Sequence, residues 1–147
     1  MATKTLVVGV GNPLLTDDSV GLRVAEGVRR SLAGRDDIEI AEEHCGGLRL
    51  MERMVGYRRA VIVDAMLGGR APGTIRCGSA ASMSTHRDAT AHDVDLATAL
   101  RLGARVGALL PDAEDVVVIG IEAADVETFG EHCTPDVAAA IPAAIDV

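Results

Sequence analysis

The chain has 147 residues, a formal net charge of −8 at pH 7, 48% hydrophobic residues and only 1% aromatic residues. Its core is therefore expected to consist of Val, Ile, Leu, Ala and Met, which suits a buried parallel sheet covered by helices. The negative charge, without any cluster of Lys and Arg, argues against nucleic acid and anionic membrane surfaces as partners.

This length is typical of one domain, so we expect residues 1–147 to form a single domain. Three cysteines without a Cys-x-x-Cys spacing argue against a disulfide framework or a zinc ribbon. No signal-peptide pattern or membrane span is evident in the N-terminal residues. We therefore expect a cytoplasmic protein with reduced thiols, and a monomer.

The first half of the chain predicts three strands separated by two helices. Residues 6–10 and 60–63 are apolar runs typical of buried strands, and residues 38–40 alternate like a strand. Apolar residues at helical spacing predict a first helix between an N-cap at Thr16 and a stop at Gly34. A shorter helix is expected between Gly46 and Gly56, and the third strand is expected to end at Asp64.

The second half begins with turn residues at 68–73, which are too few for a crossover helix. The strand expected at residues 74–77 should therefore be antiparallel and at an edge. An irregular loop is expected over residues 79–91. A capping box at residues 90–93 predicts a helix with an apolar stripe from Leu96 to Leu110. A last core strand at residues 116–121 precedes a helix that starts at Pro135 and is interrupted or bent near Pro142.

This alternation of strands and helices predicts an α/β fold: a three-layer open twisted sheet of about five strands, mostly parallel, with one antiparallel edge strand and helices on both faces. Functional sites in such sheets lie beyond the carboxyl ends of the strands. Candidate residues are therefore sought there.

The segment Gly9-Val10-Gly11-Asn12 follows the first strand and suggests a dinucleotide-binding turn, but Leu14 stands where the third glycine belongs. A tight strand-to-helix turn explains these glycines without a ligand, so no cofactor site is assigned. His44-Cys45 and His132-Cys133 are weak metal pairs because adjacent side chains on an extended chain point apart.

Two carboxylates and one histidine stand at ends of predicted elements. Asp17 and Asp18 open the first helix, where the helix dipole favours a negative charge, and either could simply be a helix-start residue. Asp64 closes the central strand, and a turn-initiating role is the alternative. His92 would lie in the first turn of its helix, where its imidazole stays neutral. Together, two carboxylates and an imidazole suit nickel or a similar divalent ion.

The chain resembles the hydrogenase maturation proteases along nearly its whole length. Residues 9–18 followed by Gly21 resemble their N-terminal signature, and Val63-Asp64-Ala65 with Pro72-Gly73-Thr74 resembles their second block. His92 with Leu96, and residues 120–122 with Thr134-Pro135, resemble the remaining two blocks.

The resemblance implies an endopeptidase that recognises nickel in a hydrogenase large-subunit precursor and removes the C-terminal extension of that precursor. Asp18, Asp64 and His92 occupy the family's three metal-contacting positions, and the precursor supplies the nickel. Asp18 or Asp64 is the expected general base for the attacking water.

Some residues depart from the family pattern. Glu43-His44-Cys45-Gly46-Gly47 stands where an Asp-Gly-Gly-Thr loop is common, which suggests a different groove for the precursor. Ser19 replaces a frequent glycine, and Ala123 replaces the usual proline. His86 lies six residues before His92; we favour His92 because it keeps the spacing to Leu96.

Two other functions remain open at this point. A nickel-binding assembly factor could use the same three residues without cleaving a peptide bond. A small nucleotide-binding protein would instead bind its ligand at the turn from Gly9 to Asn12.

Overall fold

A computed structural model describes residues 2–83 and 95–146, and it contains one five-stranded sheet in the order β2-β1-β3-β5-β4. The strands are β1 (Ala2–Val10), β2 (Ile38–Glu43), β3 (Tyr57–Met66), β4 (Ile75–Ser79) and β5 (Val116–Glu122). The helices are α1 (Val20–Ser31), α2 (Gly47–Arg53), α3 (Leu96–Arg105) and α4 (Pro135–Asp146), with short 3-10 helices η1 (Asp17–Ser19) and η3 (Ala113–Asp115).

The four strands β2, β1, β3 and β5 are parallel, whereas β4 is antiparallel to β5 and lies at an edge. The connection from β3 to β4 runs through the turn at residues 68–73, which is too short for a parallel crossover. The predicted sheet, including its antiparallel edge strand, is confirmed.

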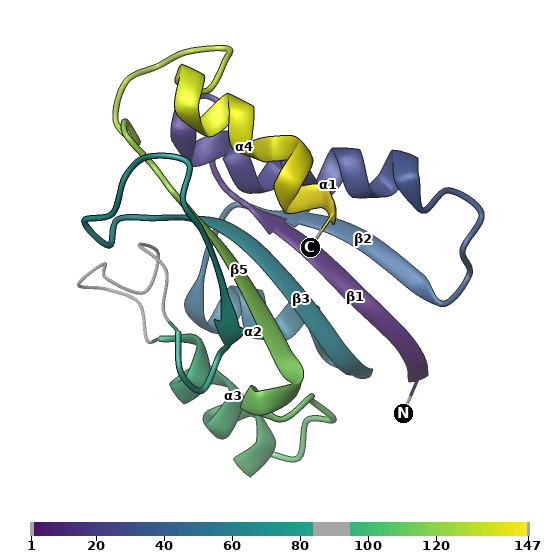
Figure 1. Ribbon diagram of the computed structural model, residues 1–147. Coiled ribbons are helices and arrows are strands. Elements are labelled where there is room, and N and C mark those ends of the chain that lie inside the picture. Colours follow the sequence, from purple (N-terminus) through teal and green to yellow (C-terminus); the bar gives the residue numbers. More distant parts are fainter. Residues whose placement is uncertain (1, 84–94, 147) are drawn as a thin grey trace.

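Helices cover both faces of the sheet, so the molecule has three layers (Figure 1). On one face α1 and α4 lie together, and their Val20, Val24 and Val137 pack on Val63 and Ile121 of the sheet. On the other face α2 and α3 bury a second apolar cluster against β1, β3 and β5. The aliphatic core expected from the composition is therefore divided between two faces.

The connections that follow β1 and β3 leave in opposite directions along the sheet. From β1 the chain passes through α1 to the outer strand β2, and α2 then returns it past β1 to β3. From β3 the chain continues toward β4 and β5 on the other side. In open α/β sheets, ligands bind in the crevice at such a switch point, here between the carboxyl ends of β1 and β3.

Several predicted boundaries were wrong. Thr16 does not cap α1, which begins at Val20 after η1, and Thr16 makes no side-chain capping bond. β3 does not end at Asp64, because its pairing with β5 continues through Asp64 to Met66. The final helix α4 continues through Pro142, so of the two predicted possibilities there an interruption is wrong.

The predicted helix stripe from Leu96 to Leu110 was too long, since α3 ends at Arg105 and Gly107 has a positive φ of 91°. The N-cap of α3 is Asp95, whose carboxylate accepts a hydrogen bond of 2.7 Å from the backbone N–H of Thr98. The predicted capping box at residues 90–93, with His92, lies outside the described residues. Within residues 2–83 and 95–146, none of the helices has the length and apolar character to cross a membrane.

Candidate active site

Buried polar side chains gather at the carboxyl end of the sheet. Among the residues that the structure describes, the buried polar or charged ones are Asp17, Asp18, Ser19, Asp64 and Glu122. The first three form η1 after β1, Asp64 lies near the end of β3, and Glu122 ends β5. Because these three strands are parallel, their carboxyl ends meet at one edge, as the sequence predicted for Asp18 and Asp64.

Glycines allow the start of α1 to pack directly on the strand ends. A Cβ atom on Gly21 would overlap the backbone carbonyl oxygens of Val10 and Val63, and one on Gly11 would overlap the carbonyl of Asp18. The helix start that carries Asp18 is thereby held against β1 and β3, and η1 contacts β3. Close packing explains these glycines without a nucleotide.

Asp64 is the first residue of β3 beyond its pairing with β1, which ends at the pair Gly9 and Val63. Its side chain is buried, and Oδ1 accepts a hydrogen bond of 2.8 Å from the backbone N–H of Ala65. Asp18 is equally buried. The structure thus places both predicted carboxylates near the carboxyl ends of β1 and β3, and the third predicted ligand, His92, lies outside the described residues.

Asp17, which the sequence left as a helix-start residue, ties two loops together. Its carboxylate accepts hydrogen bonds from the backbone N–H groups of Ala124, Asp125 and Thr134 at 2.9, 2.9 and 2.7 Å. The hydroxyl of Thr134 donates to it as well. With 0% exposure, this carboxylate fixes η1 to the segment that joins β5 to α4.

Glu122 is a buried carboxylate that the sequence analysis did not assign to the site. It accepts hydrogen bonds from the backbone N–H groups of Gly68 and Arg70 at 2.9 and 2.8 Å. It therefore holds the loop after β3 against the end of β5. A carboxylate directly after the apolar run at residues 116–121 was the signal that could have identified it, as for Asp64.

Ser19, the residue in place of a frequent glycine, connects η1 to the same segment after β5. Its hydroxyl donates to the carbonyl of Thr16 at 2.8 Å and accepts from Nε of Arg23 at 2.9 Å. The sulfur of Cys133 lies 3.8 Å from this hydroxyl. Burial raises the pKa of the Cys133 thiol and so favours its protonated form, which is the less reactive one.

Neither His44-Cys45 nor His132-Cys133 belongs to a larger group of candidate metal ligands among the described residues. No group of three or more His, Cys, Asp or Glu side chains suited to a metal ion occurs within residues 2–83 and 95–146. Cys45 is exposed, whereas Cys133 is buried. His92, which the sequence groups with Asp18 and Asp64, lies beyond these ranges.

The family model described as hydrogenase maturation protease matches residues 22–147. The chain belongs to this family. As a member of the hydrogenase maturation proteases it is a peptidase, which favours proteolysis over the assembly-factor alternative. The matched range contains Asp64 and His92, while Asp18 precedes it.

Individual maturation proteins are similar over about half or nearly all of the chain. The hydrogenase expression/formation protein HupD of Rhizobium leguminosarum bv. viciae is 29% identical, over 99% of this chain and 72% of its own length. The hydrogenase 2 maturation protease of Escherichia coli is 36% identical over 49% of this chain and 44% of its own length. The solved structure of the hydrogenase maturating endopeptidase HybD from E. coli has a TM-score of 0.74 and 28% identity, covering 97% of this chain and 88% of HybD.

Proposed function

We propose that this protease removes a C-terminal extension from the precursor of a nickel-hydrogenase large subunit, and that it recognises nickel already bound in that precursor. Membership in the family supports the peptidase reaction and a hydrogenase as its context. The observation that carries the proposal is the presence of two buried carboxylates from different elements, Asp18 in η1 after β1 and Asp64 near the end of β3, at the same edge of the sheet.

Asp18, Asp64 and His92 are the proposed contacts to the nickel of the precursor. Two carboxylate oxygens and an imidazole nitrogen suit nickel among the divalent ions, and they leave coordination positions for ligands from the precursor. The other two buried carboxylates near the site hold loops, because Asp17 and Glu122 accept several backbone hydrogen bonds. These bonds give Asp17 and Glu122 a structural role in holding the loops beside the site.

In the proposed reaction, Asp18 or Asp64 takes a proton from a water molecule that attacks the peptide carbonyl. The proton then passes to the nitrogen of the leaving segment as the peptide bond breaks. Binding of the precursor's nickel would place the scissile bond beside these carboxylates. Only nickel-loaded precursor would then be aligned for cleavage. We place this reaction in the cytoplasm and assign it to a monomer.

Incubation with nickel-loaded and nickel-free precursor tests this function. We expect a mass loss at the precursor's C-terminus with nickel only. Asp18→Asn, Asp64→Asn and His92→Ala should each lower the cleavage rate by about 10²–10⁴-fold, the usual contribution of a positioned acid or base. Asp112→Asn and His132→Ala are controls on exposed side chains and should cleave normally.

Each outcome of this experiment leads to a definite conclusion. Cleavage at the wild-type rate by any of the three site variants would remove that residue from the proposed site. Nickel-dependent binding without any mass loss would support the assembly-factor function instead. Equal cleavage of the nickel-free precursor would show that the enzyme does not recognise the metal.

A further inference from the structure

Strand β2 leaves one of its long edges without a neighbouring strand. It lies at the end of the sheet, and within residues 2–83 and 95–146 it pairs with β1 alone. The backbone N–H of Thr5 donates to the carbonyl of Asp37, and that of Gly11 donates to the carbonyl of Glu43. Since backbone groups alternate in direction along a strand, the groups of Ile38, Ile40 and Glu42 point away from β1.

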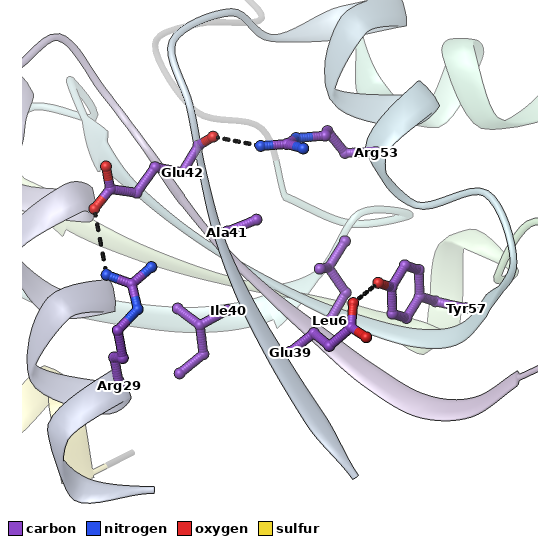
Figure 2. A pocket seen from close by; sticks show the side chains of 8 residues that line it. All are labelled: Leu6, Arg29, Glu39, Ile40, Ala41, Glu42, Arg53 and Tyr57. Carbon is purple, nitrogen blue, oxygen red and sulfur yellow. Dashed lines mark hydrogen bonds and ion pairs between the residues drawn. The ribbon is translucent and has the colours of Figure 1, made fainter. Parts of the chain in front are cut away.

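A pocket of about 490 Å³ follows this outer edge, and its lining comes from both faces of the sheet (Figure 2). Leu6, Ala41 and Tyr57 form an apolar side, in the face covered by α2 and α3. On the other side of β2, the guanidinium of Arg29 lies 3.9 Å from the carboxylate of Glu42. The pocket therefore surrounds the edge itself and does not lie on one face.

One outward backbone group of β2 already has a side-chain partner. Arg53 of α2 donates to the carbonyl oxygen of Glu42 at 3.0 Å, as Figure 2 shows. A long side chain of this kind protects a strand edge from unwanted pairing and can withdraw when a suitable strand arrives. The neighbouring carboxylates are paired as well, Glu43 with Arg53 at 3.2 Å and Glu39 with Lys4 at 2.9 Å.

The edge leads to the candidate active site. A second pocket of about 270 Å³ is lined by Pro13, Ser19, Leu22, Arg23, Glu26 and Glu42. Glu42 lines both pockets, so both lie against the same residue near the carboxyl end of β2. Ser19 belongs to η1, the element that carries Asp18. An extended chain lying along β2 would therefore be directed toward the switch-point crevice.

We propose that the outer edge of β2 binds the precursor's C-terminal segment as an added strand, next to the bond that is cut. This inference rests on the proposed function. The edge offers backbone donors and acceptors at alternate residues, which match an extended peptide, and its charged side chains are already paired with opposite charges. At about 3.3 Å per residue, the six residues of β2 align with roughly six residues of the segment. One of its side chains would occupy the apolar side near Leu6, Ala41 and Tyr57.

Ile40→Pro tests this proposal, because it removes an outward N–H group and leaves the pairing with β1 intact. Cys77→Pro is the matched control. The backbone N–H of Glu122 donates to Thr74, and that of Ala80 donates to Val116, so alternation turns the N–H of Cys77 away from β5 at the opposite edge of the sheet. We expect Ile40→Pro to raise KM for the nickel-loaded precursor about tenfold, with little change in kcat, as for the loss of one or two hydrogen bonds. Cys77→Pro should leave both constants near the wild-type values.

A proline scan of the precursor segment provides a second test with an unaltered enzyme. In an added strand, alternate residues of the segment bond to β2, so proline at successive positions should raise KM with a period of two. Wild-type KM for Ile40→Pro, or a scan without this period, would overturn the proposal while proteolysis stands. If the wild-type enzyme cleaves nothing, the proposed function fails. Binding of nickel-loaded precursor to Ile40→Pro then still tests whether the β2 edge binds the segment. Ordinary binding by that variant would overturn the inference.

Discussion

Replacement of Asp17 with alanine is expected to destabilise the protein more than any exposed aspartate does. The change removes a fully buried carboxylate that accepts hydrogen bonds from three backbone N–H groups and one hydroxyl. A hydrogen bond to a charged group contributes about 1.5–3 kcal/mol. The donors at Ala124, Asp125 and Thr134 lie on a partly exposed segment, where water replaces some of the lost bonds. We therefore expect a loss of about 3 kcal/mol in the free energy of unfolding.

Asp17→Asn separates the charge from the shape of the side chain. Oδ1 of Asp17 accepts from Thr134, and Oδ2 accepts from Ala124 and Asp125. An asparagine amide presents hydrogens on one of these two sides, so one set of donors loses its acceptor in either orientation. We expect the free energy of unfolding to fall by about 2 kcal/mol, because one or two hydrogen bonds are lost, depending on the orientation of the amide.

Guanidinium denaturation followed by circular dichroism measures both variants, with Asp112→Asn as the control because Asp112 is exposed and makes no side-chain capping bond. For a chain of this size, about 3 kcal/mol corresponds to a fall in Tm of roughly 6–12 °C. The control should change stability by less than about 0.5 kcal/mol. A similarly small change for Asp17→Ala would refute the assignment of Asp17 as the residue that joins the two loops.

Two further predictions concern α3 and the thiols. Asp95→Ala should cost about 1 kcal/mol in thermal or chemical unfolding, because it removes the N-cap of α3. The hydrogen bond from the backbone N–H of Thr98 lowers the pKa of Asp95 in the folded state. The cap therefore stabilises the fold at pH values above the ordinary aspartate pKa, and this stabilisation is lost as the pH falls through the lowered pKa. A difference in free energy of unfolding between wild type and Asp95→Ala that does not change with pH would contradict this. Iodoacetamide at pH 8 should label Cys45 and Cys77 well before Cys133, because the Cys133 thiol is buried and burial raises its pKa. The labelling rates of the native protein are read by mass spectrometry, and equal rates for the three thiols would contradict this prediction.

The sequence predicted the sheet correctly because its signals were local and strong. Apolar runs at residues 6–10, 60–63 and 116–121 identified the central strands, and a turn too short for a crossover helix identified β4 as antiparallel. The placement of candidate residues at strand ends followed from the fold class alone. The structure places Asp18 and Asp64 at that edge of the sheet, after β1 and near the end of β3.

Errors occurred where pairing or loop contacts decide the structure. β3 extends past Asp64 because β5 continues beside it, and a single-sequence pattern contains no information on that partner. Thr16 looked like a helix cap, but its backbone N–H bonds to Thr128, more than a hundred residues away, and α1 starts four residues later. Non-local contacts of this kind determine element boundaries without leaving a local signal.

The roles of the buried carboxylates could be divided only with the structure. In the sequence Asp17 and Asp18 are adjacent acidic residues with the same possible functions. The hydrogen bonds of Asp17 to residues 124, 125 and 134 identify it as a structural residue, and those of Glu122 to the loop after β3 do the same. These bonds depend on how distant loops meet, so spacing in the sequence could not reveal them.

X-ray absorption at the nickel edge tests the central claim most directly, since it reports the ligands of the precursor's nickel before and after the protease is added. When nickel-loaded precursor is mixed with the wild-type protease and frozen before cleavage, we predict additional oxygen or nitrogen ligands at ~2 Å, the usual range for such bonds in proteins. Asp18→Ala, Asp64→Ala and His92→Ala should each reduce that gain. A nickel spectrum that does not change in a complex shown by co-elution to have formed would contradict the claim that these side chains bind the metal.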